Sequence, residues 1–494
     1  MDRCIRRKLE HGRVDIGASR VRSKDHGGLK SPNSWTLKRQ KSKLSLESLS
    51  EDLLQSVLSQ LTLKEAGQTS ILSSRWKDRW TCHPNLCFYS SKLPVCDVDR
   101  FINHVNTVVE RHSCSVVDKF MVTAALRKQH ADHVDRWVGF ATASKAKHVV
   151  LDLNPAVNAH RQCEAPDKYE FCPVVNSGHR CEAADRYGFC PALHAHYQTK
   201  ADKYEFPVNL LSGRNGSCIV SLRLGFMCLK LPSDFFGFEK LKKLELHFVS
   251  VSGNLCFLAN CLSLEWLSIT HSSLPDLNIP HQLHHLQYLL VSDCCVQSIE
   301  LHAMGLTAFE YVGLPVPIKI NGCIKLSKAN ITLRWSFGNV HYIVNELFSS
   351  LAHVHNLFIK FSGLDTKGTR LGDNLSKFIH LRHLVLDFTI RRDPSSPFDV
   401  LQLTCILEAS PQLEHFVLHI HTRYARPKVM RTTDLVRPHL HHHLKTVHMT
   451  GVLGFAGQLE LAKYILLSAH GLEHMTIDTA KERKISTCTL GVVS

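Results

Sequence analysis

A short hydrophobic unit recurs along most of this chain. In each unit an apolar residue is followed three positions later by a second apolar residue and, two positions after that, by a third. One match to so short a pattern carries little weight, but many matches in order predict a repeated structure. The eleven units are Ala146–Val149–Leu151, Ile219–Leu222–Leu224, Leu241–Leu244–Leu246, Leu264–Leu267–Ile269, Leu286–Leu289–Val291, Leu306–Phe309–Tyr311, Val354–Leu357–Ile359, Leu381–Leu384–Leu386, Leu413–Phe416–Leu418, Leu444–Val447–Met449 and Leu472–Met475–Ile477.

The spacing between these units indicates the kind of repeat. From residue 219 to residue 306 the units begin 22, 23, 22 and 20 residues apart, as in leucine-rich repeats, and from residue 354 onward the steps lengthen to between 27 and 32. Each unit predicts one short strand with its second and third apolar residues turned inward. A single unit cannot bury these residues, so neighbouring units must stack and share one core. We therefore predict an α/β fold, an irregular leucine-rich-repeat solenoid with a curved parallel sheet and convex-side helices near 408–411 and 459–468.

A helical period replaces this unit near the N-terminus. Apolar residues recur every three or four positions from Leu49 to Leu61, which places them on one helical face. A short second helix is expected at 63–66, and Trp76 and Trp80 favour a third. Because about 32 residues are too few to bury so many large side chains, the rest of the chain or another protein must cover some of them.

The segment between this helical stretch and the repeats has a mixed pattern. Apolar spacing predicts helices at 97–110 and 132–143, with a strand at 115–122 between them. We interpret residues 91–145 as a linker that caps the array.

Residues 160–206 interrupt the repeats with three similar copies of a five-residue motif. The sequence Asp-Lys-Tyr-Glu-Phe at 167–171 returns in altered or identical form at 185–189 and 202–206. Since the copies resemble one another more than they resemble the strand unit, we interpret them as a duplication within one surface loop, where insertions cost little. The alternative interpretation is functional, as a multivalent peptide or a Cys/His metal site.

Four blocks of sequence near the N-terminus follow one another in a characteristic order. They are Leu49-Ser50-Glu51-Asp52-Leu53-Leu54, Leu63-Lys64-Glu65-Ala66, Thr69-Ser70-Ile71-Leu72-Ser73 and Arg75-Trp76-Lys77-Asp78-Arg79-Trp80. This stretch resembles the F-box of the plant F-box/leucine-rich-repeat/FBD family. The family usually has proline where this chain has Ser50 and often has arginine where it has Ser74. Ser50 can still begin a helix, so the first departure affects rigidity at the helix start.

The resemblance implies that the N-terminal stretch docks on a Skp-type adaptor and, through it, on a cullin–RING ubiquitin ligase. The chain would then be a substrate receptor that needs no cofactor and has no chemistry of its own. The residues expected to divide between the F-box core and the adaptor contact are Leu49, Leu53, Leu54, Val57, Leu58, Leu61, Leu72, Trp76 and Trp80.

The C-terminal part resembles the same family. Residues 411–416, 461–467 and 472–477 are similar to its FBD-type ending, which implies terminal strands and a helix that close the core. Together these patterns predict a disordered basic arm at 1–43, an F-box at 44–90, the linker at 91–145, the repeat array at 146–410 with its insertion at 160–206, FBD-type repeats at 411–479 and a disordered tail at 480–494.

Charge distinguishes the N-terminal arm from the rest of the chain. Residues 1–43 hold 13 Lys or Arg and 4 Asp or Glu, so they account for +9 of the net charge of +15. The basic run at 37–43 fits either a nuclear-import signal or a solubilising tail. The nearly neutral body argues against nucleic acid as a partner. No apolar run reaches the roughly 20 residues that a membrane span needs, and no secretory signal is evident, so we expect a nuclear or cytoplasmic protein.

Sequence motifs for catalysis or metal binding are absent. There is no Gly-rich phosphate loop after a strand, no Gly-x-Ser-x-Gly elbow and no His-Glu-x-x-His, so we expect no enzyme. None of the 18 cysteines forms a Cys-x-x-Cys pair, which argues against a zinc site, and several are expected in the core. The histidine run at 439–443 directly precedes the unit at Leu444, and we interpret it as surface residues of a turn.

Residues that alternate with the inward positions are expected on the concave surface of the sheet. Aromatic and histidine side chains at such positions suit protein recognition. The candidate target-binding residues are Trp266, Tyr288, Phe358, His383, Asp387, His415 and His419.

One alternative function stays open from the sequence. The chain could act as a protein-binding scaffold or inhibitor through its repeats, without joining a ligase, if Ser50 and Ser74 weaken docking.

Overall fold

A computed structural model describes residues 50–71, 76–90, 98–153, 203–213, 216–230, 232, 235–253, 255–334, 342–362, 378–390, 398–401, 403–422, 439–454 and 457–479. The predicted basic arm, the predicted C-terminal tail and most of the duplicated segment lie outside these residues. Leu49, Leu72 and Ser74 lie outside them as well.

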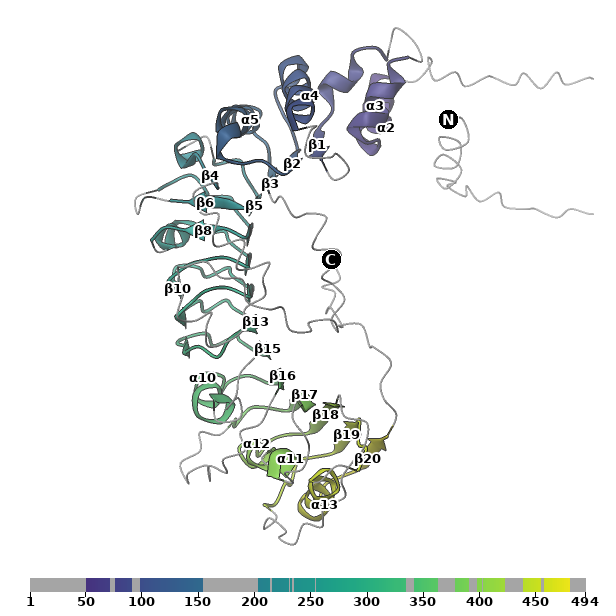
Figure 1. Ribbon diagram of the computed structural model, residues 1–494, viewed down its shortest axis with the longest axis vertical. Helices are drawn as coiled ribbons and strands as arrows, with labels where there is room; N and C mark the ends of the chain where they lie inside the picture. The colour runs from purple at the N-terminus through teal and green to yellow at the C-terminus, as the bar shows by residue number, and fades with distance from the viewer. Residues whose placement is uncertain are drawn as a thin grey trace, which may run out of the picture. The chain divides into compact units, whose positions relative to one another are not determined.

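One parallel sheet runs through the described part of the chain, and it has fourteen strands (Figure 1). Neighbours in the sheet are successive repeats, joined by parallel pairing from the first strand to the last. The strands are, in sheet order, β1 (Asn85–Tyr89), β2 (Lys119–Thr123), β3 (His148–Asp152), β5 (Ser221–Gly225), β7 (Lys243–His247), β9 (Trp266–Thr270), β11 (Tyr288–Ser292), β13 (Ala308–Gly313), β15 (Lys328–Leu333), β16 (Asn356–Ser362), β17 (His383–Ile390), β18 (His415–Thr422), β19 (Thr446–Thr450) and β20 (His474–Asp478).

The inward positions of these strands form one continuous core. Leu244 of β7 is in register with Leu222 of β5 and with Leu267 of β9, which in turn is in register with Leu289 of β11. All four side chains are buried, while the residues between the inward positions stay partly exposed. The eleven predicted units each supply one strand, so the leucine-rich-repeat fold predicted from them is confirmed.

Three strands come from units that are not among the eleven predicted, although the strand predicted at 115–122 is present as β2. Strand β2 follows Val117, and its inward residues are Phe120 and Val122. Strand β15 has Ala329 as its first inward residue, and a small residue there weakens the pattern. Strand β1 is preceded by His83, a buried polar residue where the unit has an apolar one. The sheet therefore begins before residue 146, and the predicted start of the array was too late.

Short strands form two further parallel sheets on the return path of the chain, in a separate layer in Figure 1. Each of these strands lies between two strands of the main sheet in sequence. The first sheet contains β4 (Tyr204–Glu205), β6 (Met227–Leu229) and β8 (Ser250–Val251), and the second contains β10 (Asp276–Ile279), β12 (Ser298–Leu301) and β14 (Ile318–Ile320).

Strand β4 corrects the prediction for the duplicated segment. It belongs to the third copy of the motif, and Tyr204 and Phe206 are buried in the core. Lys203 is buried too, and its Nζ donates to the carbonyl oxygen of Phe248 at 3.1 Å and to Ser250 Oγ at 3.0 Å. The prediction of a surface loop extending to residue 206 was therefore wrong at its end, because residues 203–206 belong to the solenoid.

Helices connect or cover the repeats. The predicted helices at 97–110, 132–143 and 459–468 are present, whereas the one near 408–411 lies a few residues earlier, ahead of Pro411. The α-helices are α4 (Val98–Arg111), α5 (Ala131–Ala143), α10 (Phe348–Ser350), α11 (Phe398–Leu401), α12 (Thr404–Glu408) and α13 (Gln458–Ser468), and the 3₁₀ or π turns are η4 (Lys128–His130), η6 (Val208–Leu211), η8 (Cys256–Asn260) and η9 (Ile343–Leu347).

The N-terminal helical stretch contains α2 (Glu51–Gln60), α3 (Leu63–Thr69) and the 3₁₀ turn η2 (Arg79–Cys82). Ser50 caps α2, because its side chain accepts a hydrogen bond from the backbone N–H of Leu53 at 3.4 Å. Thr62 and Glu65 form a capping box at the start of α3. A turn and η2 stand where the third helix was predicted, and residues 72–75 lie outside the described part.

Two general features of the described residues bear on function. No helix among them has both the length and the apolar character needed to cross a bilayer. The cysteines in the described part of the chain are free thiols.

The histidine run at 439–443 is not uniformly exposed. His441 is buried, with 3% of its surface exposed, so the prediction of surface residues was wrong for it. Its ring contacts Tyr464 of α13 edge-on, and its Nε2 has no hydrogen-bond partner. Burial, with the nearby His439 and His442, lowers the pKa of His441 to about 4.

We predict that His441→Leu makes the protein less sensitive to acid. The pKa of His441 is lower in the folded than in the unfolded chain, so the unfolded chain binds a proton more readily between pH 6.5 and about 4. The native protein should therefore lose stability as the pH falls through this window, and the variant should lose less. Urea midpoints at pH 7 and pH 4.5 measure the difference. Exposed His443→Leu is the control, and equal losses in wild type and His441→Leu would contradict the prediction.

Candidate functional site

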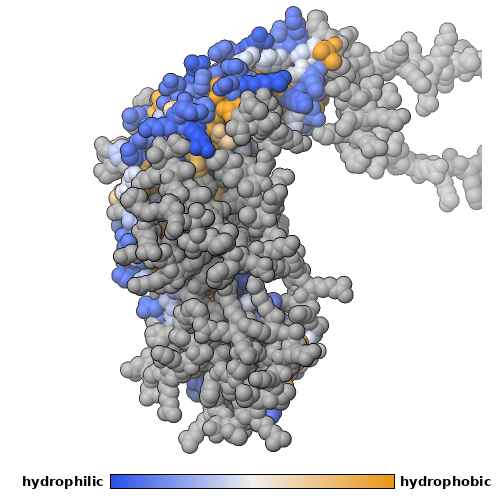
Figure 2. All heavy atoms as spheres, in the orientation of Figure 1, coloured by the Kyte–Doolittle hydropathy of each residue, from blue (hydrophilic) through white to orange (hydrophobic). Residues whose placement is uncertain are grey.

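The surface of α2 and the turn after α3 carries exposed apolar side chains. Leu53 is 54% exposed and Ile71 is 80% exposed. Figure 2 shows apolar residues on the N-terminal part of the described chain within a mainly hydrophilic surface. Large apolar side chains in water are candidates for contact with another protein, because their burial is favourable.

The residues predicted for the adaptor contact divide into groups. Leu54, Leu58 and Trp76 are buried, so the structure places them in the F-box core and not on the surface that an adaptor could contact. Val57 and Leu61 are partly exposed, and Trp80 packs against the core of the array. Of the residues predicted, Leu53 is the most exposed one that the structure describes.

His83 joins this helical stretch to the first strand of the array. Its Nδ1 accepts a hydrogen bond from the backbone N–H of Asn85 at 3.0 Å, at the start of β1. A neutral ring that accepts at Nδ1 carries its proton at Nε2. Nε2 lies 3.0 Å from the carbonyl oxygen of Leu58 and 3.1 Å from that of Leu61, so it donates to the C-terminal end of α2. One buried ring therefore fixes α2 against the array.

The second candidate surface is the outward face of the main sheet, which we call the strand face. It consists of the residues that alternate with the inward positions of the fourteen strands. The structure places all seven predicted target-binding residues on this face: Trp266, Tyr288, Phe358, His383, Asp387, His415 and His419. Their role in binding a target stays a prediction.

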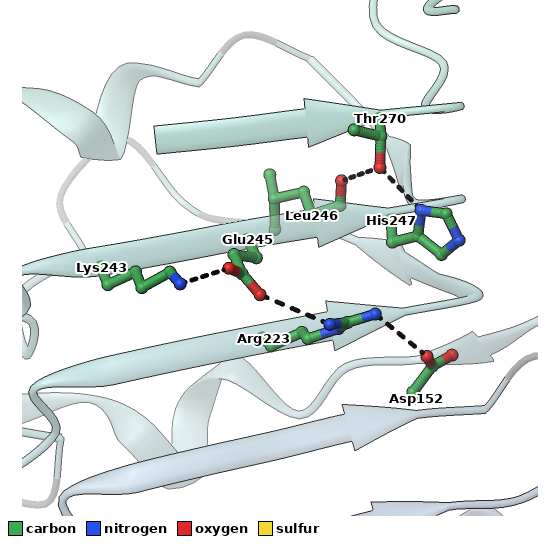
Figure 3. A network of polar contacts seen from close by, with 7 residues as sticks. All are labelled: Asp152, Arg223, Lys243, Glu245, Leu246, His247 and Thr270. Atoms are coloured by element: carbon green, nitrogen blue, oxygen red, sulfur yellow. Dashed lines mark hydrogen bonds and ion pairs between the residues drawn. The ribbon is translucent and has the colours of Figure 1, made fainter. Parts of the chain in front are cut away.

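An alternating row of charges crosses the strand face from β3 to β7 (Figure 3). Arg223 of β5 lies between Asp152 of β3 and Glu245 of β7, with nitrogen–oxygen distances of 3.7 Å to each. Lys243 approaches Glu245 to 2.7 Å. Nearby, His247 Nδ1 is hydrogen-bonded to Thr270 Oγ1 at 2.6 Å. Apart from Lys243 and Glu245, which both belong to β7, these pairs join residues of neighbouring strands that are far apart in sequence.

Two aromatic rings continue this row. Trp266 of β9 and Tyr288 of β11 stack with ring centroids 3.7 Å apart, and Lys243 Nζ lies 5.3 Å from the centre of the Trp266 ring. Burial, together with the charge of Glu310 and a hydrogen bond to it, raises the pKa of Tyr288. From β7 to β13 the strand face therefore presents the cation Lys243, the two stacked rings and the anion Glu310 on successive strands. This order suits a partner with both apolar and charged groups.

A histidine-rich group occupies the strand face on β17 to β19. The rings of His383 and His415 stack with centroids 4.5 Å apart, and His419 Nδ1 is hydrogen-bonded to Thr450 Oγ1 at 2.9 Å. Asp387 lies 2.9 Å from Lys360 Nζ and 3.2 Å from His421 Nε2. Burial opposes the charge of Asp387, but these two partners outweigh it and lower its pKa.

The sequence prediction missed the charged residues that accompany these rings. Arg223, Lys243, Glu245 and Lys360 alternate with inward residues in the same way as Trp266 does. Their position could have been found from the strand unit, but their pairing depends on the register between strands. Among the described residues, no group of three or more His, Cys, Asp or Glu is placed to hold a metal ion.

Comparison with known proteins agrees with both parts of this structure. Residues 46–88 match the family model of the F-box domain. Residues 192–491, more than half of the chain, match that of the leucine-rich-repeat domain of At1g61320/AtMIF1. The fold and these matches define an F-box protein with a leucine-rich-repeat array. The chain belongs to the At1g61320/AtMIF1 leucine-rich-repeat family, and the predicted relationship to plant F-box/leucine-rich-repeat proteins is confirmed.

Three relatives from Arabidopsis thaliana show how far the similarity extends. F-box/FBD/LRR-repeat protein At2g04230 is 24% identical over 460 residues, which cover 88% of this chain and 89% of the relative. FBD-associated F-box protein At5g44490 is 32% identical over 111 residues, 22% of this chain and 23% of the relative. Putative F-box/LRR-repeat protein At3g18150 is 30% identical over 109 residues, 22% of each. The chain thus spans less than a quarter of the latter two relatives and most of the first.

We predict that His83→Ala destabilises the protein by about 2–4 kcal/mol, because it removes a buried ring and the donor to two carbonyl groups. Urea denaturation of the full chain measures the loss, and hydrogen exchange should show that α2 opens more readily. Exposed His442→Ala should change stability by less than about 0.5 kcal/mol. Similar unfolding and exchange in the two variants would refute the role of His83.

Proposed function

We propose that this chain is the substrate-recognition subunit of an SCF-type cullin–RING E3 ubiquitin ligase. The observation that carries the proposal is the combination, in one chain, of an F-box with an exposed apolar residue on α2 and an array with a polar and aromatic strand face. The F-box docks on a Skp-type adaptor, and the array holds a target protein. Transfer of ubiquitin is then accelerated by proximity, with the chemistry supplied by other subunits. The complex acts in the nucleus or the cytoplasm.

Docking requires an apolar surface that is held in a fixed position, and α2 provides such a surface. Leu54 and Leu58 anchor the helix inside the protein, whereas Leu53 points into solvent. Burial of one exposed leucine contributes roughly 1.5–3 kcal/mol, so a few such side chains account for a stable contact. Ile71, which was not among the predicted contacts, belongs to the same docking proposal because it is the more exposed of the two.

The alternative of a scaffold or inhibitor outside a ligase rested on weakened docking. Ser50 caps α2 through its side chain, so the lack of proline does not leave the helix start unsupported. Ser74 lies outside the described residues. Of the two departures, Ser74 is therefore the one that still supports weakened docking, and we retain the ligase subunit as the proposed function.

We predict that Leu53→Asp lowers the affinity for a Skp-type adaptor at least about tenfold, because a charge replaces an apolar contact. Binding of purified full-length protein to purified adaptor, followed by calorimetry, measures the change. Ile324→Asp is the matched control, since Ile324 is 75% exposed but lies in the array. Unchanged affinity of a folded Leu53→Asp protein would sink the docking proposal. Leu54→Asp is unsuitable for this test because it would disrupt the inside of the F-box.

We predict that Trp266→Ala loses targets but keeps the adaptor. It removes the stacked ring that Lys243 and Tyr288 contact, which should weaken target binding about tenfold or more. Proteins captured from proteasome-inhibited plant cells by wild type and variant can be compared by quantitative mass spectrometry. Phe236→Ala, which removes an exposed ring outside the strand face, is the control. Identical captured sets for all three proteins would contradict a recognition role for this part of the strand face.

A further inference from the structure

Two cysteines meet where the F-box stretch enters the array. The segment that follows α4 runs beside η2, because the backbone N–H of Ser113 donates to the carbonyl oxygen of Thr81 at 3.1 Å. The hydroxyl groups of the same two residues are 2.9 Å apart. Cys82 Sγ lies 3.2 Å from Ser113 Oγ, and Cys114 follows Ser113 directly in the chain. Two thiols that are 32 residues apart in sequence are therefore neighbours in the fold.

The two cysteines lie near the surface of the protein and not in its core. Cys82 and Cys114 are both partly exposed, and together they line an open hollow of ≈ 590 Å³. Gln55 of α2 also lines it, and its Nε2 donates to the carbonyl oxygen of Cys82 at 3.2 Å. A small oxidant can therefore reach both sulfur atoms without any unfolding.

The surroundings give the two thiols different reactivity. Burial disfavours the Cys82 thiolate, but hydrogen bonds from Cys114, Ser113 and Thr81, with the charge of Arg79, outweigh it and lower the pKa of Cys82. Burial and the neighbouring Cys82 raise the pKa of Cys114 to about 11. Burial also raises the pKa of Cys261 and of Cys294, each to about 12. Cys82 is thus favoured as the attacking thiolate and Cys114 as its partner.

We propose that Cys82 and Cys114 form a peroxide-responsive thiol pair that closes to a disulfide and cross-links the F-box to the array. The Cys82 thiolate attacks one oxygen of a hydroperoxide, and the O–O bond breaks. Hydrogen peroxide releases hydroxide, which takes up a proton to form water, and Cys82 becomes a sulfenic acid. The Cys114 sulfur then attacks Cys82 Sγ, the S–O bond breaks, and the thiol proton leaves with hydroxide as a second water. Two thiols are oxidised by two electrons and one peroxide is reduced.

The disulfide would act on the same connection as His83. Cys82 directly precedes His83, whose carbonyl oxygen lies 3.4 Å from His112 Nε2 on the segment that carries Cys114. A covalent bond at this point restrains the F-box stretch against the array in addition to the noncovalent contacts. The proposal concerns the connection itself and does not depend on the identity of the adaptor or the target.

The test uses full-length protein treated with increasing hydrogen peroxide, with free thiols blocked before digestion and peptides mapped by mass spectrometry. We expect a Cys82–Cys114 cross-linked peptide, two hydrogens lighter than the separate peptides, at peroxide levels that leave exposed Cys256 reduced. Dithiothreitol should reverse it. Oxidation of Cys256 before the pair, or oxidation of Cys82 without a cross-link to Cys114, would overturn the proposal.

Two serine variants distinguish the roles of the two thiols. Cys114→Ser should accumulate a sulfenic acid at Cys82, which dimedone traps, because the resolving thiol is gone. Cys82→Ser should show no such adduct at Cys114 under the same treatment. Circular dichroism verifies that both variants are folded, and the wild-type cross-link remains decisive if either is not. Equal dimedone labelling of the two variants would overturn the assignment of Cys82 as the attacking thiol.

Discussion

The shared burial of inward side chains between successive repeats is the constraint on which the rest of this structure depends. A strand such as β9 places Leu267 and Ile269 in the interior, but one five-residue strand cannot enclose them. They are buried because Leu244 and Leu289 lie in register on either side. Each fully buried aliphatic side chain contributes roughly 1.5–3 kcal/mol, and most of that would be lost at a free end. Such an array therefore needs a cover at each end.

The two ends are covered in different ways. At the N-terminal end, Leu63 and Trp80 of the F-box stretch pack against the array core, and His83 takes the place of the apolar residue that opens a unit. At the C-terminal end, α13 buries Leu461 and Ile465, while the inward positions of β20 remain partly exposed. The F-box stretch thus covers this end of the array, so loss of its interior should also affect the first repeats.

The recurring hydrophobic unit predicted most strands of the sheet, because aliphatic residues that recur at a fixed spacing indicate buried positions. The pattern failed where the buried residue is not a large aliphatic one. His83 is buried through three hydrogen bonds, and Ala329 is buried through its small size, so neither shows in a hydrophobic pattern. Tyr204 was assigned to a loop because its motif is duplicated, although its ring is buried and its hydroxyl donates to Asp135 Oδ1 at 2.5 Å. For His83 and Tyr204 the missing information was a contact with a residue distant in sequence.

The sequence predicts which residues lie on the strand face, but it does not predict which of them contact one another. Alternation assigns Trp266, Tyr288 and His383 to one face from sequence alone. Which of these residues become neighbours depends on the register between strands, and the repeat length does not fix that register because it varies along the chain. The stacking of Trp266 on Tyr288 therefore follows from the pairing of β9 with β11. Because the shared core is built from inward residues, the outward residues can change with less effect on the fold.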